Sequence, residues 1–94
     1  MSTYTVIWEY RGGTYIKQVT AQTAELALAA WSQNLTSGEI PGIGTKRLAS
    51  LTKEIAEGVD DFYAPVMLTG LTNAWCAGML YGGMLNIIKT DTSP

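Results

Sequence analysis

The sequence predicts an α+β fold, with an antiparallel sheet of four to five strands and two helices on one face, in the order ββααβββ. Apolar residues alternate with polar ones near the N-terminus, and two short runs that are apolar on both faces lie near the C-terminus. Each pair of stretches is divided by a Gly-Gly dipeptide, Gly12-Gly13 or Gly82-Gly83, which suits a tight hairpin turn. Between the two pairs, apolar residues recur every three or four positions in two stretches, which indicates two amphipathic helices.

The first hairpin is expected to pair a strand over Tyr4–Tyr10 with a strand over Thr14–Thr20, because aromatic and β-branched residues alternate with polar ones. If Gly12-Gly13 forms the turn, Tyr10 lies opposite Tyr15.

The first helix is expected to begin at Thr23, whose hydroxyl can cap it, and to end in Thr36–Glu39. Glu25 in the first turn suits the helix dipole. Its apolar stripe consists of Ala24, Ala27, Leu28, Trp31 and Leu35.

The second helix is expected over Thr45–Glu57, after the connector Ile40–Gly44 and before a stop at Gly58. Its buried stripe consists of Leu48, Leu51, Thr52 and Ile55.

The last third of the chain predicts the central hairpin of the sheet, with strands over Thr72–Leu80 and Met84–Thr90. Tyr63–Leu68 predicts a short strand, and Pro65 places it at an edge of the sheet.

Composition predicts one domain over residues 1–94 with a frayed tail at 91–94, since 47% of the residues are hydrophobic and 15% are charged. The net charge of −2 provides no overall positive field for phosphate-rich partners. Histidine is absent and Cys76 is the one cysteine, so we expect neither a cofactor nor a metal site. The single thiol and the lack of a signal peptide favour the cytoplasm.

Phe62–Ile88 carries no charge and is long enough for a membrane-spanning helix. Its one proline, two asparagines and four glycines favour turns instead, so we expect no membrane segment.

Aromatic and apolar residues of the strands are the candidate binding surface. They are Tyr4, Trp8, Tyr10, Tyr15, Trp75 and Met79. Alternating aromatics of this kind are typical of a core or a protein interface, and a stacking platform for bases or a sugar is the alternative. Two helices are too few to cover both faces of such a sheet, so either one face stays half exposed or a second copy covers it in a homodimer.

Ile40-Pro41-Gly42-Ile43-Gly44 resembles the turn of the helix-hairpin-helix family, which has the pattern apolar-Pro-Gly-apolar-Gly. The resemblance implies a nucleic-acid phosphate held by the Gly42 and Gly44 amides, with Lys46 and Arg47 adding charge. It departs from the family at Ser37-Gly38, where an apolar residue is expected, and at Leu48, where a small residue is expected. The other interpretation is a Pro-Gly loop that leads into a capped helix.

An enzyme would depend on acidic side chains near the end of the second helix or on the cysteine. These residues are Glu54, Glu57, Asp60, Asp61 and Cys76. A helix end and a solvated loop do not form the dry cleft that such chemistry requires. The function expected from the sequence is therefore a non-enzymatic protein-protein interaction module, such as an inhibitor, an immunity-type protein or an assembly protein, bound to a protein partner or to itself. Phosphate binding and an enzyme are the alternatives.

Overall fold

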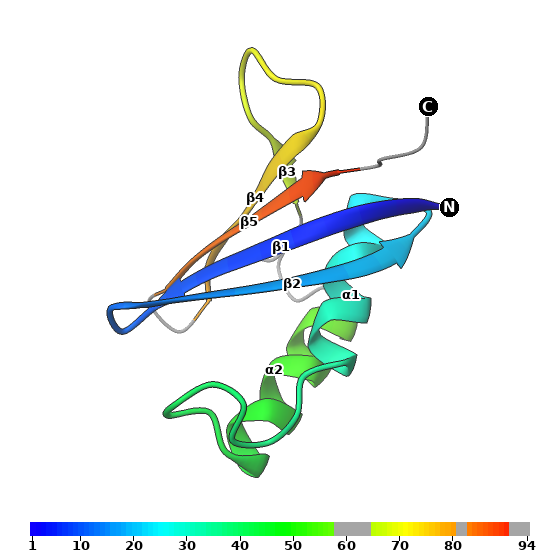
Figure 1. Cartoon of the computed structure of the whole chain (residues 1–94). Helices are drawn as coiled ribbons and strands as arrows, with labels where there is room; N and C mark the ends of the chain where they lie inside the picture. The colour runs from blue at the N-terminus through cyan, green and yellow to red at the C-terminus, as the bar shows by residue number, and fades with distance from the viewer. Residues whose placement is uncertain (58–64, 81–82, 91–94) are drawn as a thin grey trace.

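The computed structural model describes residues 1–57, 65–80 and 83–90 (Figure 1). Within them, a five-stranded antiparallel sheet carries two helices in the predicted order ββααβββ. The elements are β1 (Ser2–Tyr10), β2 (Gly13–Ala21), α1 (Ala24–Gln33), α2 (Thr45–Glu57), β3 (Val66–Met67), β4 (Ala74–Leu80) and β5 (Gly83–Lys89).

The strand order across the sheet is β2-β1-β5-β4-β3, so the last strand of the chain is the central one. This confirms the central position predicted for the C-terminal segment, and β3 is the edge strand that Pro65 predicted. β1 pairs antiparallel with β5 from Tyr4–Lys89 to Glu9–Met84. The first and last strands of the chain therefore lie side by side in the sheet. The three strands from Val66 onward exclude a single membrane-spanning helix over this stretch.

The turn of the first hairpin is Arg11-Gly12 and not Gly12-Gly13, so the predicted register was wrong by two residues. Arg11 and Gly12 have φ values of 48° and 80°, and a two-residue type I′ turn requires positive φ at both positions. The Arg11 guanidinium lies 5.3 Å from the centre of the Tyr10 ring, which offsets part of the cost of about 1–2 kcal/mol for a non-glycine residue in this conformation. Tyr10 pairs with Gly13, where a Cβ atom would lie 2.6 Å from the Tyr15 hydroxyl.

The second hairpin differs from the prediction in the same way, because Gly83 is the first residue of β5 and pairs with Leu80. Gly82 lies outside the described residues. An irregularity between Cys76 and Met79 shifts the register of β4 against β5.

The predicted start of α1 is confirmed, since the Thr23 hydroxyl accepts a hydrogen bond of 3.2 Å from the Leu26 amide. The helix ends earlier than predicted, at Gln33 with Asn34 as its C-cap. The Asn34 amide donates to the Ala30 carbonyl at 3.0 Å, and the chain then turns Leu35 back into the core.

The bounds of α2 agree with the prediction, and this helix packs beside α1 on the same side of the sheet. The connector before it has a structural role, because the Ile40 and Ile43 side chains are buried in the core. The Ile43 amide donates to the Ile40 carbonyl at 3.0 Å, which closes the connector into a turn.

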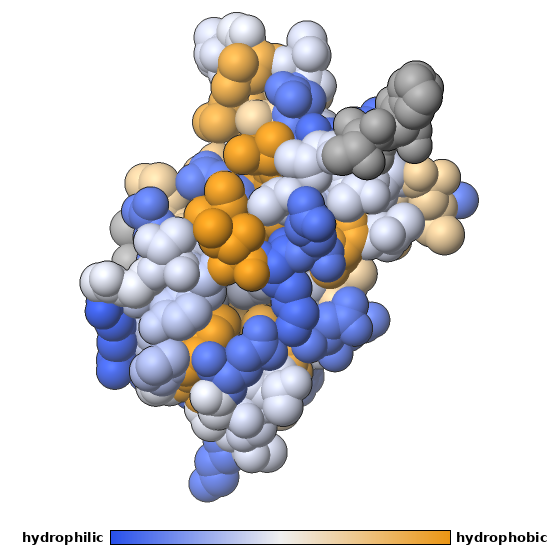
Figure 2. All heavy atoms as spheres, in the orientation of Figure 1, coloured by the Kyte–Doolittle hydropathy of each residue, from blue (hydrophilic) through white to orange (hydrophobic). Residues whose placement is uncertain are grey.

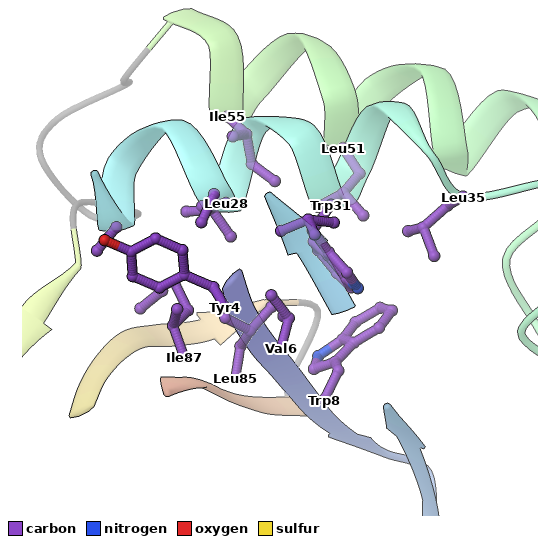
Figure 3. Close-up of a cluster of buried hydrophobic side chains, with 14 of the residues drawn as sticks. Tyr4, Val6, Trp8, Leu28, Trp31, Leu35, Leu51, Ile55, Leu85 and Ile87 are labelled. Carbon is purple, nitrogen blue, oxygen red and sulfur yellow. The ribbon is translucent and has the colours of Figure 1, made fainter. Parts of the chain in front are cut away.

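The core lies between the helices and the face of the sheet that carries the aromatic side chains (Figure 3). Trp8 is fully buried, with its ring edge-to-face against Trp31 at 5.5 Å and stacked on Tyr10 at 4.6 Å. Leu85 and Ile87 of the central strand are also fully buried beneath the helices. The large aromatic side chains therefore hold both helices to one face.

Leu51→Ala in α2 should lower the free energy of unfolding by about 2–5 kcal/mol, because Leu51 is fully buried and its removal leaves a cavity. Leu26→Ala on α1 is the control, because Leu26 is 51% exposed and its loss should cost less than about 0.5 kcal/mol. Urea unfolding curves measure both values. Equal effects would show that α2 does not contribute to the core.

Candidate interaction surface

The aromatic face predicted as a binding surface is mostly the core of the protein. Tyr4, Trp8 and Tyr10 are at most 4% exposed, since both helices cover the side of the sheet to which they point. This corrects their assignment as interface residues, and it also removes the stacking platform. Tyr15 and Trp75 are half-buried at the margin of the core, and the Trp75 ring lies 5.8 Å from that of Tyr4. Trp75 thus packs mainly against its own chain, and the side chain of Met79 lies outside the described residues.

The opposite face of the sheet carries no helix among the described elements (Figure 1). One line of paired residues crosses it from β2 to β3. The line consists of Ile16, Ile7, Asn86, Cys76 and Val66. We call this side the uncovered face.

Apolar side chains of the uncovered face are accessible to solvent. Ile16 is 63% exposed and Val66 is 66% exposed, while Ile7 and Cys76 are partly buried. Threonine and glutamine side chains border them, and Gln18 donates a hydrogen bond of 3.1 Å to the Thr5 hydroxyl. The face thus carries exposed apolar side chains near both edges of the sheet, together with polar residues that include Asn86 in the middle and the exposed Glu9.

The segment from β3 to β4 presents a second group of exposed apolar side chains, which we call the apolar turn. Its members are Val66, Met67, Leu68 and Leu71, with exposures between 38% and 66%. Figure 2 shows this apolar surface over the β3–β4 connection at the top of the view, with further apolar atoms over the strands. Val66 belongs to both groups and joins the apolar turn to the uncovered face, whereas Met67 pairs with Trp75 and lies on the helix side of this edge.

Backbone hydrogen bonds fix the conformation of the apolar turn. The Leu71 amide donates to the Leu68 carbonyl at 3.1 Å, and the Leu68 amide donates to the Ala74 carbonyl at 2.9 Å. Gly70 has a φ of 83°, which the third position of a type II turn requires. The exposed leucines therefore project from an ordered turn, and little conformational entropy is lost when a partner binds them.

Two of the four residues of the predicted phosphate site, Gly42 and Arg47, lie beside Tyr10. Arg47 donates a hydrogen bond of 2.8 Å to the Tyr10 hydroxyl, and Arg11 lies over the Tyr10 ring. Gly42 borders both groups, because a Cβ added there would lie 3.3 Å from the Arg11 guanidinium. The structure thus brings Arg47 and Gly42 to Tyr10 together with Arg11. The sequence did not indicate Arg11, because only the fold brings the first hairpin to this connector.

The paired helices of the helix-hairpin-helix turn are not formed. α1 ends at Gln33, and residues 34–39 separate it from Ile40. Gly44 precedes α2 directly, and its carbonyl accepts a hydrogen bond from the Leu48 amide at 2.9 Å. Lys46 lies in the first turn of this helix.

The residues considered for catalysis do not converge within the described part of the chain. Glu54 lies on α2, whereas Cys76 lies on the uncovered face, on the other side of the sheet. Asp60, Asp61 and the side chain of Glu57 lie outside the described residues. Among the side chains that are described, no group of three or more histidine, cysteine or acidic residues is arranged to hold a metal ion. Neither helix in the described ranges has the length and hydropathy required to cross a bilayer.

Comparisons of the chain with protein-family models, with curated proteins and with solved structures gave no match. Function is therefore inferred from the geometry of this chain alone.

An ion pair holds the segment just before the Ile40–Gly44 connector to β2. The Lys17 ammonium lies 3.1 Å from the Glu39 carboxylate and donates to the Asn34 carbonyl at 2.9 Å. A hydrogen bond from the Thr36 amide is the main cause that lowers the pKa of Glu39 below its ordinary value; partial burial opposes this, and Lys17 lowers the pKa further.

Glu39→Gln should reduce stability at pH 7 by a few tenths of a kcal/mol, a small effect because the pair is solvent-exposed. Because the folded carboxyl has the lower pKa, its stabilisation is present above the ordinary glutamate value of about 4.3 and is lost as the pH falls through the folded value. The difference between wild type and variant should therefore vanish in acid, as measured by urea unfolding at several pH values. Glu9→Gln, at an exposed position, is the control. A difference that does not change with pH would contradict this role.

Proposed function

We propose that this protein is a small non-enzymatic module that binds another protein through the apolar turn and the adjoining uncovered face. The observation that carries the proposal is the position of four exposed large apolar side chains within residues 66–71, two on β3 and two in the ordered turn that follows it. Exposed apolar clusters of this kind mark interaction sites in soluble proteins. An inhibitor, an immunity-type protein or an assembly protein would each use such a surface, because each acts by occupying another protein.

The free energies of apolar burial and of association favour a partner that contacts both the apolar turn and the uncovered face. Burial of four half-exposed apolar side chains contributes on the order of 4–6 kcal/mol. Association costs a comparable amount in lost translational and rotational freedom. The apolar turn by itself therefore gives weak binding, and the Ile7, Ile16 and Met84 side chains, farther along the uncovered face beyond Cys76 and Asn86, supply the additional area.

Substitution of Leu68 and Leu71 by serine tests the proposal. The double variant Leu68→Ser/Leu71→Ser should bind the partner at least about tenfold more weakly, since truncation of central interface residues typically costs 1–2 kcal/mol or more each. Leu26→Ser is the matched control, because Leu26 is 51% exposed but lies on α1, away from the turn. Affinity purification from cell extract shows the stoichiometric partner, and titration of the purified complex measures the change.

Retention of the partner by the double variant would overturn the proposed surface. A wild-type protein that neither retains a stoichiometric partner nor self-associates in light scattering would overturn the proposed function itself.

Phosphate binding is a second candidate function, favoured by the approach of both Arg11 and Arg47 to Tyr10 beside Gly42. It requires salt-sensitive binding of duplex or single-stranded nucleic acid, which Lys46→Glu/Arg47→Glu should abolish. Lys53→Glu, at an exposed position of α2, is the control for total charge. No wild-type binding at low salt in fluorescence anisotropy would exclude this function.

A further inference from the structure

The two edges of the sheet differ in how well they are protected from another strand. At one edge, β3 has two residues and follows Pro65, and both features hinder strand addition. At the other edge, β2 has nine residues and contains no proline. Its pairing with β1 runs from Ser2–Ala21 to Tyr10–Gly13 without an irregularity.

The one charged residue of β2 does not guard its edge. Charged side chains on edge strands usually repel an approaching strand. Here the Lys17 ammonium is held on the helix side of the sheet by the Glu39 carboxylate and the Asn34 carbonyl. The local charge is thus balanced, and the Ile16 side chain beside it is 63% exposed.

The backbone of β2 presents its outer hydrogen-bonding groups at alternate residues. Gly13 pairs with Tyr10 across a two-residue turn, which is a hydrogen-bonded pair in this type of hairpin. Counting from Gly13, the groups directed away from β1 belong to the even-numbered residues. These are Thr14, Ile16, Gln18 and Thr20, and all four are exposed. Within the described ranges, no backbone hydrogen bond joins this edge to another segment.

We propose that β2 pairs antiparallel with β2 of a second copy of this chain, about a twofold axis that passes through Ile16. The two five-stranded sheets then form one continuous sheet of ten strands, with the helices of both copies on the same side. This goes beyond the proposed function, because it uses an edge of the sheet and leaves the apolar turn of each copy accessible.

Side-chain chemistry selects this axis over its neighbour. An axis through Lys17 would place the two ammonium groups directly opposite each other, which destabilises a strand pair. An axis through Ile16 pairs residues 13–19 of the two copies, with Ile16 opposite Ile16 of the second copy on the uncovered face. Lys17 then lies opposite Tyr15 of the second copy, where its stem can pack on the ring.

Cysteine cross-linking tests both the pairing and the axis, in a Cys76→Ser background. Hydrogen-bonded antiparallel partners have Cα atoms about 5.5 Å apart, which a disulfide can span. Ile16→Cys should therefore form an intermolecular disulfide on mild oxidation. Thr14→Cys and Gln18→Cys are the matched controls: neither should cross-link to itself, but a mixture of the two should, because Thr14 lies opposite Gln18 of the second copy. Non-reducing electrophoresis and intact mass give the result.

Light scattering gives a second readout without a new covalent bond. The Cys76→Ser protein should have twice the chain mass of 10.1 kDa at micromolar concentration. Ile16→Lys should weaken the dimer at least about tenfold, because it places like charges on the axis. Circular dichroism checks that this variant keeps its fold. Leu68→Ser/Leu71→Ser should remain dimeric, which separates this inference from the proposed function.

A monomeric Cys76→Ser protein at about 100 μM would overturn the inference. Cross-linking at the same rate for residues 14, 16 and 18, or fastest at a residue other than Ile16, would overturn the twofold axis.

Discussion

The structure depends on two helices that cover only one face of a five-stranded sheet. The covered face takes the large aromatic side chains, with Trp8 packed edge-to-face on Trp31. The Trp8 indole nitrogen is buried without a hydrogen-bond partner among the described residues. Burial of such a group costs about 1–3 kcal/mol, which the aromatic packing offsets. Because the aromatic side chains fill the core, the other face holds smaller apolar residues and polar ones, and the chain has no further helix in the described ranges to cover them.

This asymmetry links the proposed roles of the protein. The uncovered face is continuous with the apolar turn through Val66, and both are held in place by ordered backbone. The β2 edge belongs to the same sheet, so a second copy added there would extend the uncovered face without burying it. The basic side chains around Tyr10 lie on the helix side, where Arg47 and Arg11 meet the connector. The surface proposed for phosphate thus lies on the other side of the sheet from the surface proposed for a protein partner.

The fold was largely predictable because its determinants are local. Hydrophobic periodicity, the Thr23 cap and the bounds of α2 depend on neighbouring residues, and the structure confirms them. The turn at Arg11 was not predictable, since its positive φ is supported by a contact with the Tyr10 ring. The interface prediction failed for Tyr4, Trp8 and Tyr10 because alternation separates two faces without saying which one the helices cover. The polar residues on the other face, namely the threonines, Gln18 and Glu9, indicated that the helices cover the aromatic face. The exposure of Val66–Leu71 could not be predicted from neighbouring residues, because a short apolar run is also typical of a buried strand.

The exposure of methyl groups along β5 tests the one-sided covering of the sheet most directly. A soluble paramagnetic agent that broadens solvent-accessible methyl signals in NMR spectra distinguishes neighbouring residues of this strand. The structure predicts strong broadening for Met84, which is 47% exposed, and protection of Leu85 and Ile87, which are fully buried. Ile16 on β2 should broaden as Met84 does. Broadening of Leu85 and Ile87, or equal protection of all four residues in a dilute monomeric sample, would contradict an uncovered sheet face.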